Sequence, residues 1–216
     1  MNENATFTRM ARQLWDATRR NQRPNMPVHM APEERDCYEH LLTLSETVVE
    51  YGVGGSTLMA LKQRGLKKLI SVDSDPRWID NISQVPEVAS AISDGTANIL
   101  YADIGEVGRW GKPVGKEKIE QWFRYPATPW EHIDRADLVF VDGRFRVACI
   151  IEAVLRAQPR TIIAVHDFWD RPQYHATLQF LEWRQSCGTL GVFRARADID
   201  RESAMALLEK ARIISA

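Results

Sequence analysis

The chain has 216 residues, a formal net charge of −1, 44% hydrophobic residues and 26% charged residues. That length accommodates one domain with a single hydrophobic core. A net charge this close to zero argues against binding to nucleic acid or an anionic membrane through bulk electrostatics. The N-terminus is polar and no apolar run reaches membrane-spanning length, so we expect a cytoplasmic protein with neither a nucleic-acid nor a membrane partner.

Neither the cysteines nor the basic N-terminal segment indicates a special site. Cys37, Cys149 and Cys187 are widely separated, odd in number and outside any zinc-ligand spacing. We therefore expect neither a disulfide framework nor a structural zinc site. Five arginines lie between residues 9 and 23. A solvated helix face explains such a cluster more often than a nucleic-acid-binding arm, and we favour it.

Helical patterns alternate with short apolar runs along the chain. We expect a helix at 9–20, a linker at 21–27 and a helix at Pro32–Ser45, which opens with proline and acids. Apolar residues then recur at helical spacing from Val147 to Leu155. The runs read as strands, and they are Thr47–Tyr51, Lys68–Val72, Ala97–Tyr101, Asp137–Val141, Thr161–Val165 and Gly188–Ala195. This alternation predicts an α/β fold, a doubly wound, mostly parallel sheet with helices on both faces.

Residues 104–134 form an unusually long connection between two expected strands. This segment is rich in glycine, proline and tryptophan. Long connections in compact domains are usually functional or disordered. We therefore expect a single domain over residues 1–216, with an N-terminal helical extension at 1–31 and an inserted loop or lid at 104–136.

The first expected strand runs directly into a glycine-rich turn. The segment reads Glu50-Tyr51-Gly52-Val53-Gly54-Gly55-Ser56-Thr57, and a helix follows it. Glycines at such a turn let the backbone pass close to a ligand and adopt positive φ angles. The helix offers free N–H groups to anything negative. A tight turn without a ligand uses the same residues, so the turn alone leaves both interpretations open.

The next two strands end in acids. Asp73 follows Gly52 by 21 residues, a spacing at which an acid accepts the ribose hydroxyls of a nucleoside. Asp103 ends the third strand and could accept an adenine amine. Each acid alone is more often a cap or loop residue. Together with the glycine turn they favour a nucleoside site, since open α/β sheets bind ligands at this edge. Thr57 replaces the third glycine of a nicotinamide fingerprint, and no lysine follows to make a P-loop.

These motifs resemble those of the class I S-adenosylmethionine-dependent methyltransferases. The likeness covers about residues 33–195 and is strongest to a bacterial subgroup that is distantly similar to catechol-type and plant xylan methyltransferases. It implies a seven-stranded sheet that binds S-adenosylmethionine. It also implies that Glu50 and the turn residues Gly52, Gly54, Gly55 and Ser56 hold the methionine part, with Asp73 on the ribose and Asp103 on the adenine. Ser56 departs from the family pattern, which has glycine there.

Two later strands end in residues suited to catalysis. Asp142 follows one of them, and His166-Asp167 follows the next, on the same edge as the glycine turn. Histidine can deprotonate a hydroxyl near neutral pH, and paired carboxylates can instead hold a Mg²⁺-type ion. Catechol-type methyltransferases carry metal ligands at positions matching Asp142 and Asp167, but Phe168 stands where their third ligand, an asparagine, would be. We therefore favour metal-free base catalysis over a divalent metal.

Arginines and aromatic residues near this edge have two interpretations each. Arg144, Arg146 and Arg171 could clamp an acidic substrate group or pair with neighbouring acids, and neither reading is preferred. Four aromatic residues of the insertion could stack on a ligand, although packing onto the body is the commoner role. They are Trp110, Trp122, Tyr125 and Trp130.

We expect an S-adenosylmethionine-dependent methyltransferase that methylates a hydroxyl of a small molecule or saccharide. The alternative is a non-catalytic protein that kept the fold and binds a nucleoside or S-adenosylmethionine without transfer. An oxidoreductase is a further alternative, against which the missing third glycine argues. The acceptor, the use of a metal and the oligomeric state, a homo-oligomer included, are left open by the sequence.

Overall fold

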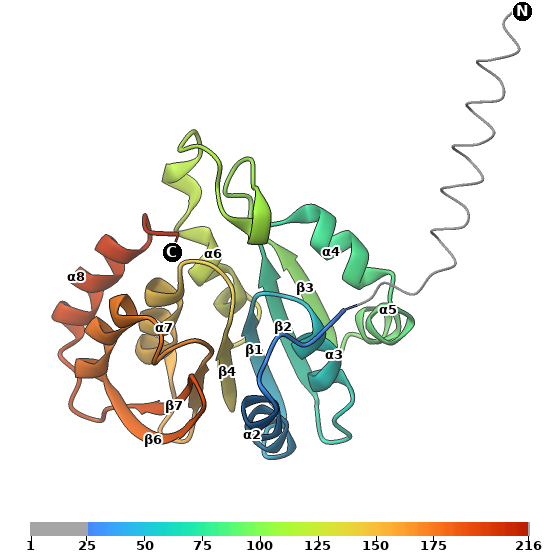
Figure 1. Cartoon of the computed structure of the whole chain (residues 1–216), viewed down its shortest axis with the longest axis horizontal. Coiled ribbons are helices and arrows are strands. Elements are labelled where there is room, and N and C mark those ends of the chain that lie inside the picture. The colour runs from blue at the N-terminus through green and yellow to red at the C-terminus, as the bar shows by residue number, and fades with distance from the viewer. Residues whose placement is uncertain (1–25, 216) are drawn as a thin grey trace, which may run out of the picture.

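A computed structural model describes residues 26–215. Its seven strands form one sheet in the order β3-β2-β1-β4-β5-β7-β6 (Figure 1). They are β1 (Thr47–Tyr51), β2 (Lys68–Asp73), β3 (Ala97–Tyr101), β4 (Leu138–Val141), β5 (Ile162–Val165), β6 (Leu181–Cys187) and β7 (Leu190–Ala195). The first five strands are parallel, and β7 lies antiparallel between β5 and β6. The expected helix at 9–20 and its arginines lie outside the described residues.

Helices cover both faces of the sheet. The α-helices are α2 (Pro32–Thr43), α3 (Gly55–Leu61), α4 (Pro76–Ser83), α5 (Pro86–Ser93), α6 (Arg124–Ala127), α7 (Arg146–Arg156) and α8 (Arg201–Ala211). The short helical turns are η1 (Arg109–Gly111), η2 (Ile119–Gln121), η3 (Thr128–Glu131) and η4 (Pro172–Phe180). The mixed sheet between helical layers confirms the expected doubly wound architecture.

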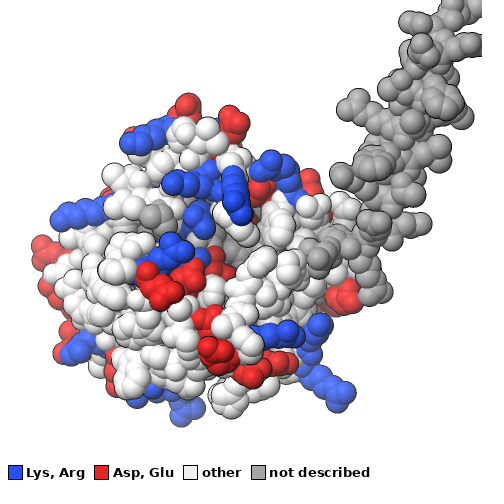
Figure 2. Space-filling view, viewed as in Figure 1, with Lys and Arg blue, Asp and Glu red and all other residues white. Residues whose placement is uncertain are grey.

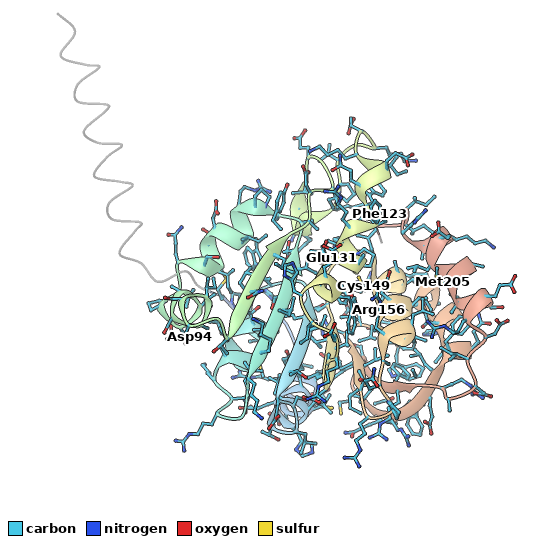
Figure 3. All side chains as sticks on the ribbon, turned by 180° about the vertical axis from the view of Figure 1, so that it is seen from behind. Asp94, Phe123, Glu131, Cys149, Arg156 and Met205 are labelled. Atoms are coloured by element: carbon cyan, nitrogen blue, oxygen red, sulfur yellow. The ribbon has the colours of Figure 1, made fainter. Side chains whose placement is uncertain are left out.

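Alternation along the strands assigns side chains to two separate cores. In β1, Val49 and Tyr51 join the core under α6, α7 and α8, whereas Val48 joins the core under α2 and α3. Successive residues of a strand point to opposite faces, and here both faces are buried, which explains the nearly continuous apolar runs. Seen from behind in Figure 3, Cys149 lies on α7 in the core, and Met205 lies on α8 at the outer surface.

One strand has no counterpart among the expected runs. β6 is an edge strand whose central residues are all exposed, and its sequence carries Glu182, Arg184 and Gln185. Among the described residues it pairs with β7 alone, with a register shift between Trp183 and Gln185. A polar edge strand lacks the apolar signature of a buried one, and charges on an edge discourage pairing with other chains.

The insertion packs onto the body through its aromatic residues. Trp122, Tyr125 and Trp130 are buried in the core on the α7 side. The Trp130 indole donates to the Tyr51 hydroxyl, which itself donates to the Pro126 carbonyl. Trp110 is 61% exposed, unlike the other three. No helix within residues 26–215 is both long enough and apolar enough to cross a membrane.

Candidate functional site

A cavity of about 590 Å³ opens at the carboxyl edge of the parallel strands. That volume falls in the range of about 300–1,000 Å³ typical of small-molecule sites. Most of the residues expected at a site line it, and these are Gly52, Gly54, Gly55, Ser56, Asp73, Asp142, His166 and Asp167. Glu50 and Asp103 do not line it.

The glycine turn is shaped by close backbone contact with the turn after β4. Gly52 has a φ of 96°, a left-handed value that glycine adopts without strain. A Cβ at Gly52 would lie 2.9 Å from the Gly143 backbone, and one at Gly143 would lie 2.9 Å from the Gly52 nitrogen. A Cβ at Gly54 would meet only the Trp78 ring, at 3.8 Å. Gly52 is therefore required by the fold, whereas the space beside Gly54 is available to a ligand.

Glu50 supports the glycine turn through buried hydrogen bonds and does not line the cavity. Its side chain is fully buried and accepts hydrogen bonds from the hydroxyls of Ser56 at 2.6 Å, Thr57 at 2.7 Å and Ser71 at 2.6 Å. Burial raises the pKa of Glu50 to about 7, and the three hydroxyl donors oppose that rise. The residue thus ties the start of α3 to β1 and β2.

Asp73 links the end of β2 to the glycine turn. Its carboxylate accepts backbone N–H bonds from Val53 at 3.1 Å, Ser74 at 2.7 Å and Asp75 at 2.9 Å. Burial raises its pKa above the ordinary value, against the effect of these donors. A carboxylate oxygen can accept two hydrogen bonds. Asp73 Oδ2 accepts only the one from Val53 among the described residues, so it can still accept a ligand hydroxyl. Its place on the cavity wall agrees with the expected ribose contact.

Asp103 lies away from this cluster. It forms an ion pair with Lys118 of the insertion and accepts from the Gly105 backbone at 3.1 Å. The Lys118 hydrogen bond is the main cause of its lowered pKa. The structure therefore places Asp103 at the base of the insertion, and the adenine contact stays a prediction.

Asp142, His166 and Asp167 come together, as expected from their strand ends. One ligand-type atom from each lies within 4.8 Å of the others. Asp167 has a φ of 57°, a left-handed conformation that costs a non-glycine residue about 1–3 kcal/mol and often marks a functional site. Asp142 and Asp167 are partly exposed to the cavity, and His166 is nearly buried.

A buried arginine joins the two carboxylates. The Arg146 guanidinium, 6% exposed, donates to Asp142 Oδ1 at 2.9 Å and to Asp167 Oδ2 at 3.2 Å. It also donates to the backbone carbonyls of Asp142, Gly143 and His166. Of the two readings open for Arg146 in the sequence, the geometry supports pairing with acids. Arg171 lies 3.6 Å from Asp167, whereas Arg144 forms no ion pair within residues 26–215.

Both ring nitrogens of His166 face carboxylates. Nδ1 lies 2.9 Å from Asp142 Oδ1, and Nε2 lies 3.2 Å from Glu34 Oε2 on α2. Burial alone would lower the pKa of His166, but the hydrogen bond and charge of Asp142, with the charges of Asp167 and Glu34, raise it to about 9. The ring is therefore an imidazolium at neutral pH, with a proton on each nitrogen donated to an acid. This arrangement does not favour His166 as the base.

Glu34 belongs to the same network, although the sequence indicated for it only a role in the first turn of a helix. It accepts from the Ala31 backbone at 2.9 Å, as a capping acid does, and also from the Thr189 backbone and hydroxyl. Burial would raise its pKa, but the Thr189 and Ala31 bonds and the charge of His166 lower it to about 2. Its partner His166 lies 132 residues away, and no local pattern reveals that contact.

The donor set does not suit a divalent cation. The Arg146 guanidinium already brings a positive charge to both Asp142 and Asp167. His166 has no free ring nitrogen to offer, and Phe168 is buried in the core. A divalent ion prefers several oxygen ligands free of competing cations. The geometry thus favours an internal ion-pair network at this position.

Two short segments cover the cavity, and for one of them, the insertion, the sequence predicted a loop or lid. Residues 27–30 line the cavity, and a Cβ at Gly55 would lie 2.7 Å from the Val28 side chain. Trp110 of η1 lines it from the insertion and packs edge to face on His29, with ring centroids 5.8 Å apart. Trp110 also has a left-handed φ of 61°. Contacts between segments this distant in sequence leave no local signal.

Comparison with solved structures supports one fold. A methyltransferase-like protein from Silicibacter pomeroyi has a TM-score of 0.76 at 28% identity, over 89% of this chain and 99% of that one. An O-methyltransferase from Bacillus cereus, solved in complex with SAH, has a TM-score of 0.50 at 12% identity, over 90% of this chain and 92% of that one. No protein-family model and no curated protein sequence matches the chain. The chain has the fold of the class I S-adenosylmethionine-dependent methyltransferases.

Proposed function

We propose that the protein is an S-adenosylmethionine-dependent methyltransferase that transfers the methyl group to a hydroxyl of a small molecule or saccharide. One observation carries the proposal, and it is the convergence of a glycine turn, a β2 acid and a carboxylate pair on one cavity. Open α/β sheets bind ligands at the carboxyl edge of their strands, and this chain has the fold of class I methyltransferases.

The residues at the cavity suit S-adenosylmethionine. The space beside Gly54 is bounded by the Trp78 ring, and Asp73 offers oxygens to ribose hydroxyls. Gly55 and Ser56, at the start of α3, line the cavity, and the first N–H groups of a helix are available to a negatively charged group. Bound there, S-adenosylmethionine supplies a methyl group on a positively charged sulfur. Asp142 and Asp167 line the same cavity, where an acceptor would meet that methyl group.

Oxygen methylation requires that the acceptor lose a proton as it attacks. Asp142 and Asp167 are the groups that can accept this proton, since both reach the cavity and His166 is already charged. Arg146 and His166 hold the two carboxylates in place through charge-assisted hydrogen bonds. The preorganised network thereby fixes the base beside the acceptor.

The other candidate, a binding protein without transfer activity, draws support from the same network. Arg146 donates to both carboxylates, and charge-assisted pairing weakens a carboxylate as a base. Binding of S-adenosylhomocysteine with no methylation of any acceptor in a broad hydroxyl panel would select this candidate. Transfer to one acceptor would remove it.

Calorimetry with S-adenosylhomocysteine tests the cofactor site directly. Gly54→Val should abolish binding, because the new side chain fills space that the ligand needs while its Cβ meets only Trp78 at 3.8 Å in the protein itself. Gly65→Val is the matched control, because Gly65 is exposed and a Cβ there meets nothing within 4 Å. Unchanged affinity in Gly54→Val, with the fold intact by circular dichroism, would show that the ligand does not bind at the turn.

A further inference from the structure

Two arginines on the cavity wall lack an acidic partner. Four arginines line the cavity, and they are Arg109, Arg144, Arg146 and Arg171. Arg146 is held by two carboxylates, and Arg171 shares Asp167 with it. Within the described part of the chain, Arg109 and Arg144 form no ion pair. Two guanidinium groups without a carboxylate partner on a concave wall make the local electrostatic potential positive, which attracts anions.

Arg144 also carries a buried donor that nothing accepts. Its Nε is shielded from solvent and has no hydrogen-bond partner among residues 26–215. Buried polar atoms are nearly always paired, so this Nε is an exception, and the rest of the partly exposed Arg144 side chain lines the cavity. The backbone N–H of Arg144 donates to the buried Tyr125 hydroxyl at 3.2 Å, which fixes the base of the side chain.

Arg144 lies against the turn that carries Arg109. A Cβ on Gly111 would lie 4.0 Å from Arg144 Cγ, so the arginine stem lies against η1, which begins at Arg109. The Arg109 guanidinium lies over the Trp110 ring, 5.3 Å from its centroid. Figure 2 shows basic side chains gathered beside a hollow on this face, with acidic ones on its other side.

We propose that Arg109 and Arg144 bind an anionic group of the methyl acceptor, a carboxylate or a phosphate. The inference rests on the proposed function and specifies its substrate class. Guanidinium groups bind both anions with paired N–H donors, and phosphate offers one more oxygen than carboxylate. Arg144 follows Asp142 by two residues in the turn after β4, on the reaction edge. An anion held there places the rest of the acceptor beside Asp142 and Asp167.

The test uses the full chain saturated with S-adenosylhomocysteine and two simple anions. Inorganic phosphate and benzoate are titrated separately, and saturation is followed by NMR shifts or calorimetry. At least one anion should bind saturably, and Arg144→Gln and Arg109→Gln should each weaken it at least tenfold. Arg160→Gln is the control, because Arg160 is exposed just before β5, at the opposite end of that strand, and should change nothing. The stronger anion identifies the acceptor's group as phosphate or carboxylate.

The results that would overturn the proposal can be told apart. No saturable binding of either anion, or binding that persists in both variants, removes the anion site. Anions that bind only without S-adenosylhomocysteine, together with weaker S-adenosylhomocysteine binding in Arg144→Gln, assign the arginines to the cofactor carboxylate instead. Failure of the unaltered protein to bind S-adenosylhomocysteine contradicts the proposed function, and titration of the free protein still tests the arginines.

Discussion

Glu50 and Asp73 are carboxylates near the ends of neighbouring strands, yet their surroundings give them different roles. Glu50 points into a buried set of three hydroxyls, whereas Asp73 lies on the cavity wall. The sequence motif placed both acids at the cofactor turn. It could not separate them, because the direction of a side chain depends on the strand's pleat and on Ser71, which comes from the neighbouring strand.

Replacing Asp73 should weaken cofactor binding without unfolding the protein. Asp73→Ala removes the acceptor for ribose hydroxyls, and hydrogen bonds to a charged group contribute about 1.5–3 kcal/mol. Titration calorimetry with S-adenosylhomocysteine should show a corresponding loss of affinity in the variant. Replacing S-adenosylhomocysteine by its 2′,3′-dideoxy analogue should lower the affinity of the unaltered protein far more than that of the variant. Asp80→Ala, an exposed change on α4, is the control. Equal losses of affinity for the analogue in both proteins would count against the ribose contact.

The Glu34–His166 pair should make stability depend on pH in two windows. The pKa of His166 rises from 6.5 to about 9 on folding, so its contribution is complete below pH 6.5 and is lost as the pH rises through 9. The pKa of Glu34 falls from 4.5 to about 2, so its contribution is complete above pH 4.5 and is lost as the pH falls toward 2. The pair therefore stabilises the fold most between about pH 4.5 and 6.5.

Urea unfolding of His166→Asn at several pH values measures the upper window. The difference in free energy of unfolding between the unaltered protein and the variant should shrink by up to about 3 kcal/mol from pH 6.5 to 9.5, at about 1.4 kcal/mol for each unit of pKa shift. His40→Asn on the exposed side of α2 should show no such change. A constant difference across this range would mean that His166 is neutral in the folded protein.

At the scale of elements, buried strands were predictable and the edge strand was not. β1 and β3 begin and end where their apolar runs do, and β4 and β5 start one residue later than expected. β6 is exposed along most of its length, and the expected final strand at Gly188–Ala195 covers only β7. Apolar periodicity records burial, so it identifies strands covered on both faces and misses one whose central residues are exposed.

Helix α2 should be tied to the reaction edge by Glu34. Glu34→Gln keeps the size of the side chain but turns one acceptor oxygen into an NH₂ group that faces donors from Ala31, Thr189 or His166. The free energy of unfolding should fall by about 2 kcal/mol, the usual scale for a charged hydrogen bond. The matched change Glu33→Gln, exposed on the same turn, should cost less than about 0.5 kcal/mol. Similar losses in the two variants would contradict the link.

At the scale of the whole molecule, parallel strand order gathers the site. Strand ends separated by many residues meet at one edge, which is why Gly52, Asp73, Asp142 and His166 could be placed together from their positions after strands. The sequence placed Arg146 near this edge and left its pairing with acids as one of two readings, but it did not place Glu34 there. Arg146 and Glu34 come from helices, and the rotation and packing of these helices decide which groups the two side chains reach.

The internal ion-pair network leads to a last prediction about ligands and heat. A ligand that binds only the folded protein stabilises it by about 2.7 kcal/mol at a hundred times its Kd. For a chain of this size that is a rise in Tm of roughly 5–10 °C for S-adenosylhomocysteine. Millimolar Mg²⁺ or Mn²⁺, and prior dialysis against a chelator, should leave Tm unchanged, because Arg146 already donates to Asp142 and Asp167.

Thermal unfolding with each ligand makes this measurement, and two variants interpret it. A saturable rise in Tm with Mn²⁺ that disappears in Asp167→Asn but remains in Asp170→Asn would show that an ion displaces the guanidinium from the carboxylates. Asp170 is exposed and lies three residues after Asp167. Asp170→Asn is therefore a control for the loss of one acidic charge nearby. A flat response to both ions in all three proteins, with the S-adenosylhomocysteine shift intact, is the outcome expected when Arg146 and His166 already supply positive charge to the carboxylates.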